Sequence, residues 1–98
     1  MPQIDERKLY ADAIIREGNQ LFNRGEYEPA AQRYEKTARF SSTELLDKTF
    51  IFEAYRLAIN AWISAGKPEN VSKTIENLPQ ELKITLLKEI FINVIGNV

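Results

Sequence analysis

The sequence contains neither cysteine nor histidine, and both absences narrow the chemistry open to it. Nucleophilic catalysis by a Ser-His-Asp or Cys-His arrangement is excluded, because each arrangement needs one of the missing side chains. Zinc sites built from Cys or His ligands are excluded for the same reason, and no disulfide framework can form. We therefore expect no enzyme activity, no metal site and no cofactor.

An excess of charge of one sign is also missing. The chain carries 13 basic and 14 acidic residues, for a formal net charge of −1, and the two signs are mixed along it. Nucleic-acid-binding domains are typically marked by a basic patch, so we expect no nucleic acid partner. No apolar run approaches the ~18 residues of a membrane-spanning helix, and the N-terminus has no apolar signal segment. These features predict a cytoplasmic protein without a membrane partner.

What is present is a helical pattern. At 98 residues the chain has the length of one domain, 1–98. Apolar and small residues recur at three-and-four spacing, and no sustained strand alternation interrupts them. The pattern predicts an all-α fold of antiparallel hairpins, with helices at about 5–24, 27–40, 41–65, 68–77 and 79–94.

Helix ends are predicted from capping residues. Gly25 and Gly66 are expected to end the first and third helices, and Gly25 to have a positive φ. Ser41 and Glu44 have the spacing of a capping box that starts the third helix. Four acid-first ion pairs one turn apart are expected to support the helices: Asp12–Arg16, Glu35–Arg39, Glu44–Lys48 and Glu69–Lys73.

The stretch from residue 18 to residue 40 has a more specific pattern. Two crossing helices need small residues where their backbones approach and large ones where the gap opens. Gly18 and Ala30 fit the first need, and Tyr27 and Tyr34 fit the second. We expect a tightly packed hairpin here.

These spacings resemble the tetratricopeptide repeat over residues 12–40. The positions that carry the resemblance are Ile14, Gly18, Asn19, Leu21, Phe22, Gly25, Tyr27, Ala30 and Tyr34. A second, degenerate copy at about 53–78 follows if Gly66 is aligned with Gly25. Its distance from the first exceeds the family's usual repeat of about 34 residues, and Ile59 replaces an expected small residue. The resemblance implies an α–α superhelix of about five helices, and a bundle of three or four helices, as in MIT or HEPN domains, stays open.

The resemblance also implies a function. In that family the first helix of each repeat lines a concave groove that binds a peptide or protein segment. The equivalent positions here are Ile15, Asn19, Phe22, Asn23, Arg56, Asn60 and Ile63. Asn side chains can bond a peptide backbone, and Arg56 can pair with a carboxylate. We therefore expect a non-enzymatic protein–protein interaction module, with the alternative that Asn19 and Asn60 only satisfy local backbone groups or solvent.

The family's chaperone-binding members hold a peptide carboxylate with Lys and Asn one turn apart. Ile15 stands where that Lys would be, so half of the pair is missing.

The C-terminal helix suggests a second function. One stripe, Ile84, Leu87, Phe91 and Val94 or Ile95, is predicted to dock on the preceding helices. That choice leaves Leu86, Ile90 and Ile92 wholly or partly uncovered, whereas the end helix of a monomeric array needs a polar outer face. The other interpretation is that this helix lies deep between the two preceding helices and needs a wide apolar stripe. The alternative prediction is a structural subunit that forms a homodimer, or binds a fixed partner, through these three residues.

Overall fold

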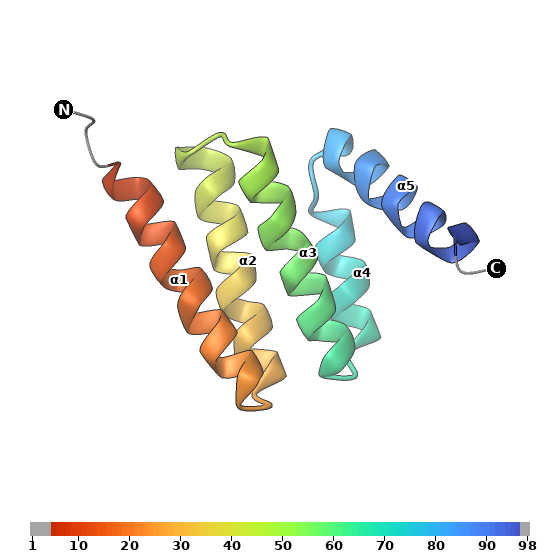
Figure 1. The fold of residues 1–98 in the computed structure, drawn as a ribbon, viewed down its shortest axis with the longest axis horizontal. Helices are drawn as coiled ribbons and strands as arrows, with labels where there is room; N and C mark the ends of the chain where they lie inside the picture. The colour runs from red at the N-terminus through yellow and green to blue at the C-terminus, as the bar shows by residue number, and fades with distance from the viewer. Residues whose placement is uncertain (1–4, 97–98) are drawn as a thin grey trace.

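The computed structural model describes the backbone of residues 5–96 and the side chains of residues 5–89. Within these residues it contains five α-helices and no strand, which confirms the all-α prediction. The helices are α1 (Glu6–Asn23), α2 (Tyr27–Glu44), α3 (Lys48–Ser64), α4 (Pro68–Glu76) and α5 (Gln80–Gly96) (Figure 1).

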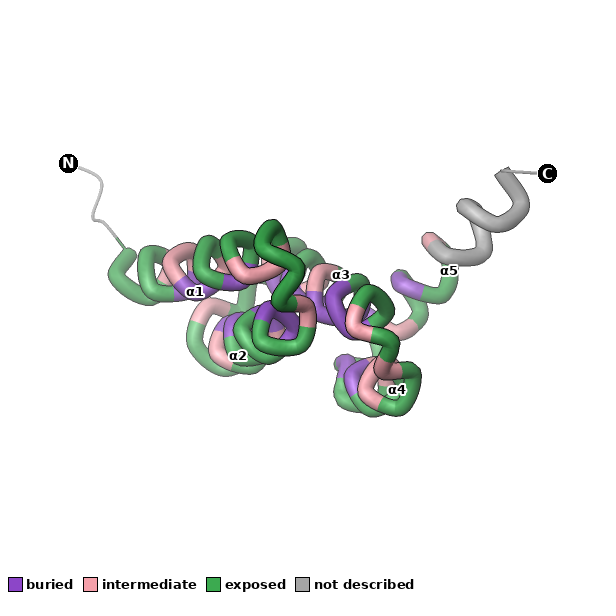
Figure 2. Tube along the Cα trace, turned by 90° about the horizontal axis from the view of Figure 1, so that it is seen from below, coloured by how far each residue is buried: buried purple, intermediate pink, exposed green. Residues whose placement is uncertain are grey.

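The helices alternate between two layers. Seen from below in Figure 2, α1, α3 and α5 form one row, and α2 and α4 form the other. Helix α2 packs along both α1 and α3, and α4 packs on α3. Because successive helices run in opposite directions, α1 and α3 run the same way within their layer (Figure 1). The superhelical twist of a tetratricopeptide array stays a prediction.

The buried residues form two core clusters, and Figure 2 shows where buried residues lie along the helices. The first cluster joins α3 to α2 and to the start of α5 and consists of Ala38, Ile51, Ala54, Tyr55, Ile59, Leu78, Leu82 and Leu86. The second cluster joins α2 to the later part of α3 and consists of Ala30, Ala31, Tyr34, Ala58, Ala61 and Trp62. Both clusters centre on α3, which explains why its sequence is apolar on most sides.

Both turn glycines have the left-handed backbone predicted for a helix end. The φ angle is +79° at Gly25 and +71° at Gly66, so the prediction for Gly25 is confirmed. The backbone N–H of the residue after each glycine closes the turn by a hydrogen bond to the last turn of the helix. Glu26 donates to the Leu21 carbonyl, and Lys67 donates to the Trp62 carbonyl. The chain can then reverse at once into α2 and α4.

The boundary between α2 and α3 differs from the prediction. Helix α2 continues through Ser41 to Glu44, and α3 begins only at Lys48. Ser41 is fully buried inside α2, so it cannot act as a cap. Asp47 takes that role, since its carboxylate accepts a hydrogen bond from the Phe50 N–H at 3.2 Å. The capping-box prediction was wrong because burial of the Ser41 turn outweighs its local preference.

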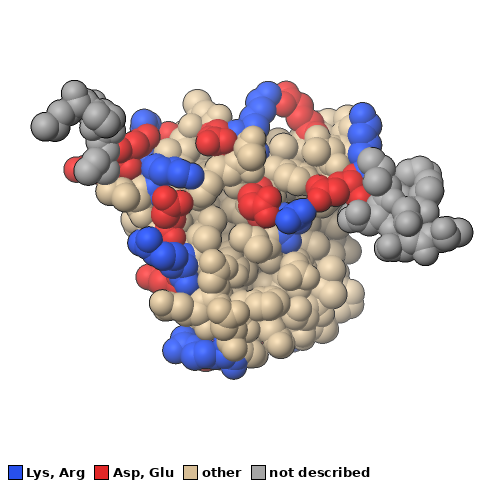
Figure 3. Space-filling view, viewed as in Figure 1, with Lys and Arg blue, Asp and Glu red and all other residues tan. Residues whose placement is uncertain are grey.

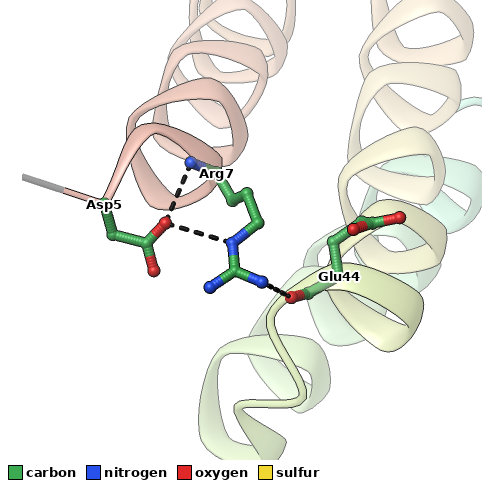
Figure 4. Close-up of polar contacts among 3 residues, drawn as sticks. All are labelled: Asp5, Arg7 and Glu44. Atoms are coloured by element: carbon green, nitrogen blue, oxygen red, sulfur yellow. Dashed lines mark hydrogen bonds and ion pairs between the residues drawn. The ribbon is translucent and has the colours of Figure 1, made fainter.

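The predicted ion pairs are also replaced. None of the four lies within 4.0 Å among the described side chains, and Lys8–Asp12 forms the pair one turn apart. Arg7 instead links two elements (Figure 4). Its guanidinium contacts the Asp5 carboxylate at 3.2 Å and donates to the Glu44 carbonyl at 2.9 Å. The start of α1 is thereby tied to the end of α2.

Helix α5 presents a different face to the core than predicted. Leu82 and Leu86 are buried in the first cluster, whereas Ile84 and Leu87 are 48% and 59% exposed. The predicted docking stripe was therefore wrong, and Leu86 is not an uncovered interface residue. The physical reason is that Leu78, Leu82 and Leu86 form a stripe spaced by about one turn, which continues from the preceding turn onto α3. The other predicted interface residues, Ile90 and Ile92, lie outside the described side chains.

Candidate functional site

The predicted groove residues lie on α1 and α3, the two neighbouring helices of one layer. Five of them are exposed: Asn19, Asn23, Arg56, Asn60 and Ile63. Ile15 and Phe22 are half-buried, and each packs against one of the core clusters. Phe22 also contacts Tyr27, with ring centroids 4.9 Å apart. These two side chains mainly hold α1 in place and offer only part of their surface to a ligand.

Asn19 has a structural role that the sequence did not reveal. Its Oδ1 accepts a hydrogen bond from the Tyr34 hydroxyl at 2.6 Å. Tyr34 lies against Gly18, since a Cβ added there would be 2.7 Å from the ring carbon Cε1. Burial raises the pKa of the Tyr34 hydroxyl, which keeps it a donor. One lone pair of Asn19 Oδ1 is therefore used within the fold, and its second lone pair and its NH₂ group are left for a ligand.

Arg56 is engaged as well. Its guanidinium lies 2.6 Å from a carboxylate oxygen of Glu89 on α5 and 3.0 Å from one of Glu53. The hydrogen bond that Arg56 donates to Glu89, followed by the charge of Glu53, raises the pKa of Arg56. An arginine with two carboxylate partners has little capacity left for a ligand carboxylate. Its observed role is to join α3 to α5, which no sequence pattern predicts.

The exposed groove residues of α3 lie on one outer stripe, because Arg56, Asn60 and Ile63 follow one another at four- and three-residue spacing. Asn60 also follows Leu57 by one turn, and Leu57 packs against the cluster that contacts Phe22 of α1, so Asn60 lies on the α1 side of this stripe. Ile63 lies on its other side, toward Glu89 of α5, the partner of Arg56. A single ligand-binding face can include Asn19, Asn23 and Asn60, while Ile63 lies at its edge.

The α1–α3 face is free of charge at one end. The sequence has no charged residue from 18 to 23 or from 57 to 66. Because α1 and α3 run in the same direction, these two segments lie at the same end of the layer. Figure 3 shows mostly uncharged atoms over the lower central part of this face, with the ion pairs gathered along its upper part and its left edge. We call residues 18–23 and 57–66 together the uncharged face.

A hollow that no sequence pattern predicts lies at the opposite end of the helices. A cavity of about 360 Å³ lies between the α2–α3 turn and the start of α5. Leu46 lines it, is 73% exposed and has a φ of +54°. Neither a Gly nor a Pro marks this turn, so the sequence carried no signal for it.

Among the described residues no group of three or more His, Cys, Asp or Glu side chains could hold a metal ion. No helix within the described part of the chain is long and apolar enough to cross a membrane.

Comparison with known proteins gives no assignment. No protein-family model, no curated protein and no solved structure matches the chain. The likeness to the tetratricopeptide repeat thus rests on the residues of the sequence alone.

Proposed function

We propose that the protein is a non-enzymatic interaction module that binds an extended segment of a partner protein on the uncharged face. One observation carries this proposal: two parallel helices bring uncharged segments, with exposed amide side chains, to the same end of one layer. The ion pairs elsewhere on the surface already interact with water, so solubility does not account for an uncharged region with exposed amide side chains.

The chemistry of the face suits a peptide backbone. Each exposed amide offers both donors and an acceptor, so Asn23 and Asn60 can bond successive peptide groups, and the Asn19 NH₂ can donate to a carbonyl. Binding there strips no charged group of water, which avoids the largest desolvation cost. We expect affinity that changes little with salt, in contrast to binding by charge pairing.

A matched pair of variants tests the proposal. Peptides are selected from a random displayed library against the chain, and their affinities are measured for Asn60→Asp and Gln32→Glu. Both changes turn an exposed amide into a carboxylate, but Gln32 belongs to α2 in the other layer. We expect roughly tenfold weaker binding for Asn60→Asp, from a lost hydrogen bond and an unpaired charge, and no change for Gln32→Glu. Equal affinities for the two variants would refute the proposal.

A second candidate function is self-association through α5, and the exposure of Ile84 and Leu87 favours it. Two large apolar side chains one turn apart on an outer helix face are typical of a contact surface. A homodimer through this face should dissociate in the variant Leu87→Glu. Sedimentation of the unchanged chain as a monomer at micromolar concentration would exclude this function.

A further inference from the structure

The layer opposite the uncharged face contains a small polar hollow. It has a volume of about 160 Å³ and lies between α2 and α4. Its lining consists of Glu35 and Arg39 from α2, Tyr55 from α3, and Thr74 and Asn77 from α4. All five side chains carry hydrogen-bonding groups, which is unusual for a gap between packed helices.

Tyr55 is the residue that marks this hollow as more than a surface irregularity. The side chain belongs to the first core cluster and is only 6% exposed. Its hydroxyl makes no hydrogen bond to the described residues, and Tyr55 is one of the residues that line the hollow. A buried hydroxyl presented in this way is available to a ligand.

The wall around Tyr55 is held rigidly. Glu35 Oε1 accepts a hydrogen bond from Trp62 Nε1 at 3.2 Å and lies 2.5 Å from the Thr74 hydroxyl. The same hydroxyl lies 2.8 Å from the Asn70 carbonyl, so its single hydrogen serves one acceptor at a time. Glu35 Oε2 makes no described hydrogen bond, and Arg39 makes no described ion pair. The hollow thus offers a carboxylate acceptor and a guanidinium donor beside the Tyr55 hydroxyl.

We propose that this hollow recognises a carboxamide group of a protein partner. The charges of Glu35 and Arg39 cancel, so a neutral group with both a donor and an acceptor matches the lining better than an anion or a cation. A carboxamide NH₂ can donate to Glu35 Oε2, and its oxygen can accept from Tyr55 and Arg39. The volume is below the ~300 Å³ at which pockets for whole small-molecule ligands begin, which favours a single side chain or peptide group.

The carboxamide can come from a Gln or Asn side chain or from a peptide bond, and three probes separate these sources. They are the N-acetyl methylamides of Gln, Leu and Glu, which share their peptide groups and differ in the side chain. The indole N–H of the only Trp donates into the hollow wall at Glu35, so its NMR signal reports occupancy. We expect saturable shifts at millimolar concentration, as is typical of one or two hydrogen bonds.

The order of affinities decides the outcome. Tightest binding of the Gln probe supports side-chain recognition, and equal binding of the Gln and Leu probes supports recognition of the peptide group. Tightest binding of the Glu probe, or no saturable shift with any probe, overturns the proposal.

Two variants add a check on the lining. Tyr55→Phe removes only the hydroxyl and should weaken binding about two- to tenfold, whereas Tyr27→Phe, outside the hollow, should not change it. Arg39→Gln changes an exposed residue and tests the same wall without disturbing the core. Unchanged affinity in both Tyr55→Phe and Arg39→Gln would also overturn the proposal. Because the hollow and the uncharged face lie on opposite layers, this result is independent of the peptide test above.

Discussion

The two hairpins of this protein are held together in different ways. In the first, α1 and α2 each have 18 residues and approach closely where Gly18 leaves room for the Tyr34 ring. In the second, α4 has only 9 residues against the 17 of α3, and Ile59 stands at the place of Gly18 when Gly66 is aligned with Gly25. The second hairpin depends instead on hydrogen bonds from Trp62 and Thr74 to Glu35 of α2.

The difference shows how a short helix can be retained. A helix of two to three turns has little apolar surface to bury and is unstable alone. Thr74, the buried residue of α4, fixes it through a carboxylate that belongs to the first hairpin. This bond ties the second hairpin to the first, and the following changes test how each hairpin is held, from the largest expected effect to the smallest.

Trp62→Ala should have the largest effect. Trp62 is buried in the second cluster and also donates to Glu35, so the variant leaves a cavity and removes the hydrogen bond that joins α3 to Glu35 of α2. We expect a loss of about 3–5 kcal/mol in the free energy of unfolding, measured by urea denaturation. In Trp62→Phe, which keeps most of the volume, the loss should be much smaller. Equal losses in the two variants would contradict the role of packing here.

Gly18→Ala tests the close approach in the first hairpin. In a helix interior this change normally stabilises by about 1 kcal/mol, but here the new Cβ would lie 2.7 Å from Tyr34 Cε1. Since Tyr34 is buried and bonded to Asn19, its ring cannot move freely, and we expect a net destabilisation of about 1–3 kcal/mol. Combining the change with Tyr34→Leu should restore the ordinary helix preference. A stabilising Gly18→Ala on its own would show that the approach is not tight.

Gly25 and Leu46 both have a positive φ, so removing a glycine at one turn and adding a glycine at the other should change stability in opposite directions. Gly25→Val should destabilise by about 1 kcal/mol or more, because a β-branched residue is strained at its φ of +79°. Leu46→Gly should stabilise by up to about 1 kcal/mol, because the side chain is mostly exposed and its φ of +54° favours glycine. Thermal or urea unfolding measures both. Shifts of the same sign would contradict the strain at Leu46.

The Lys48–Glu81 ion pair, which joins α3 to α5 at 2.7 Å, should have the smallest effect. The hydrogen bond from Lys48 lowers the pKa of Glu81 from 4.5, and the hydrogen bond to Glu81 raises the pKa of Lys48 from 10.5. A lowered carboxyl pKa gives stability that is lost as pH falls through it, and a raised amine pKa gives stability that is lost as pH rises through it. We expect the free energy of unfolding to show a small plateau between these two pH limits. The plateau should be absent in Glu81→Gln. Both groups are exposed, so salt should flatten the plateau.

Much of the fold followed from the sequence, because it depends on local signals. Gly25 and Gly66 marked their turns through the backbone shape that only glycine adopts easily. The α2–α3 boundary was missed since Leu46 takes the same shape without glycine, and Ser41 is buried by tertiary packing. The face of α5 was missed because its apolar residues cover nearly all sides, so periodicity could not select Leu82 and Leu86.

The candidate site was predicted less completely. The family resemblance named Asn23 and Asn60 among the groove residues, and both are exposed on α1 and α3. Their role in binding stays a prediction. Residue spacing within one helix does not predict hydrogen bonds to another helix. The bonds between Asn19 and Tyr34 and between Arg56 and Glu89 could therefore not be predicted. The hollow at Tyr55 was missed for the same reason, since its lining comes from three helices.

The most direct test of the central claim is a map of where a selected peptide binds. Backbone amide shifts are recorded by NMR as a peptide from the displayed library is added to the chain. The uncharged face predicts that the largest shifts fall within residues 18–23 and 57–66 and persist at high salt. Shifts confined to α2 and α4, or shifts that disappear with added salt, would contradict the account.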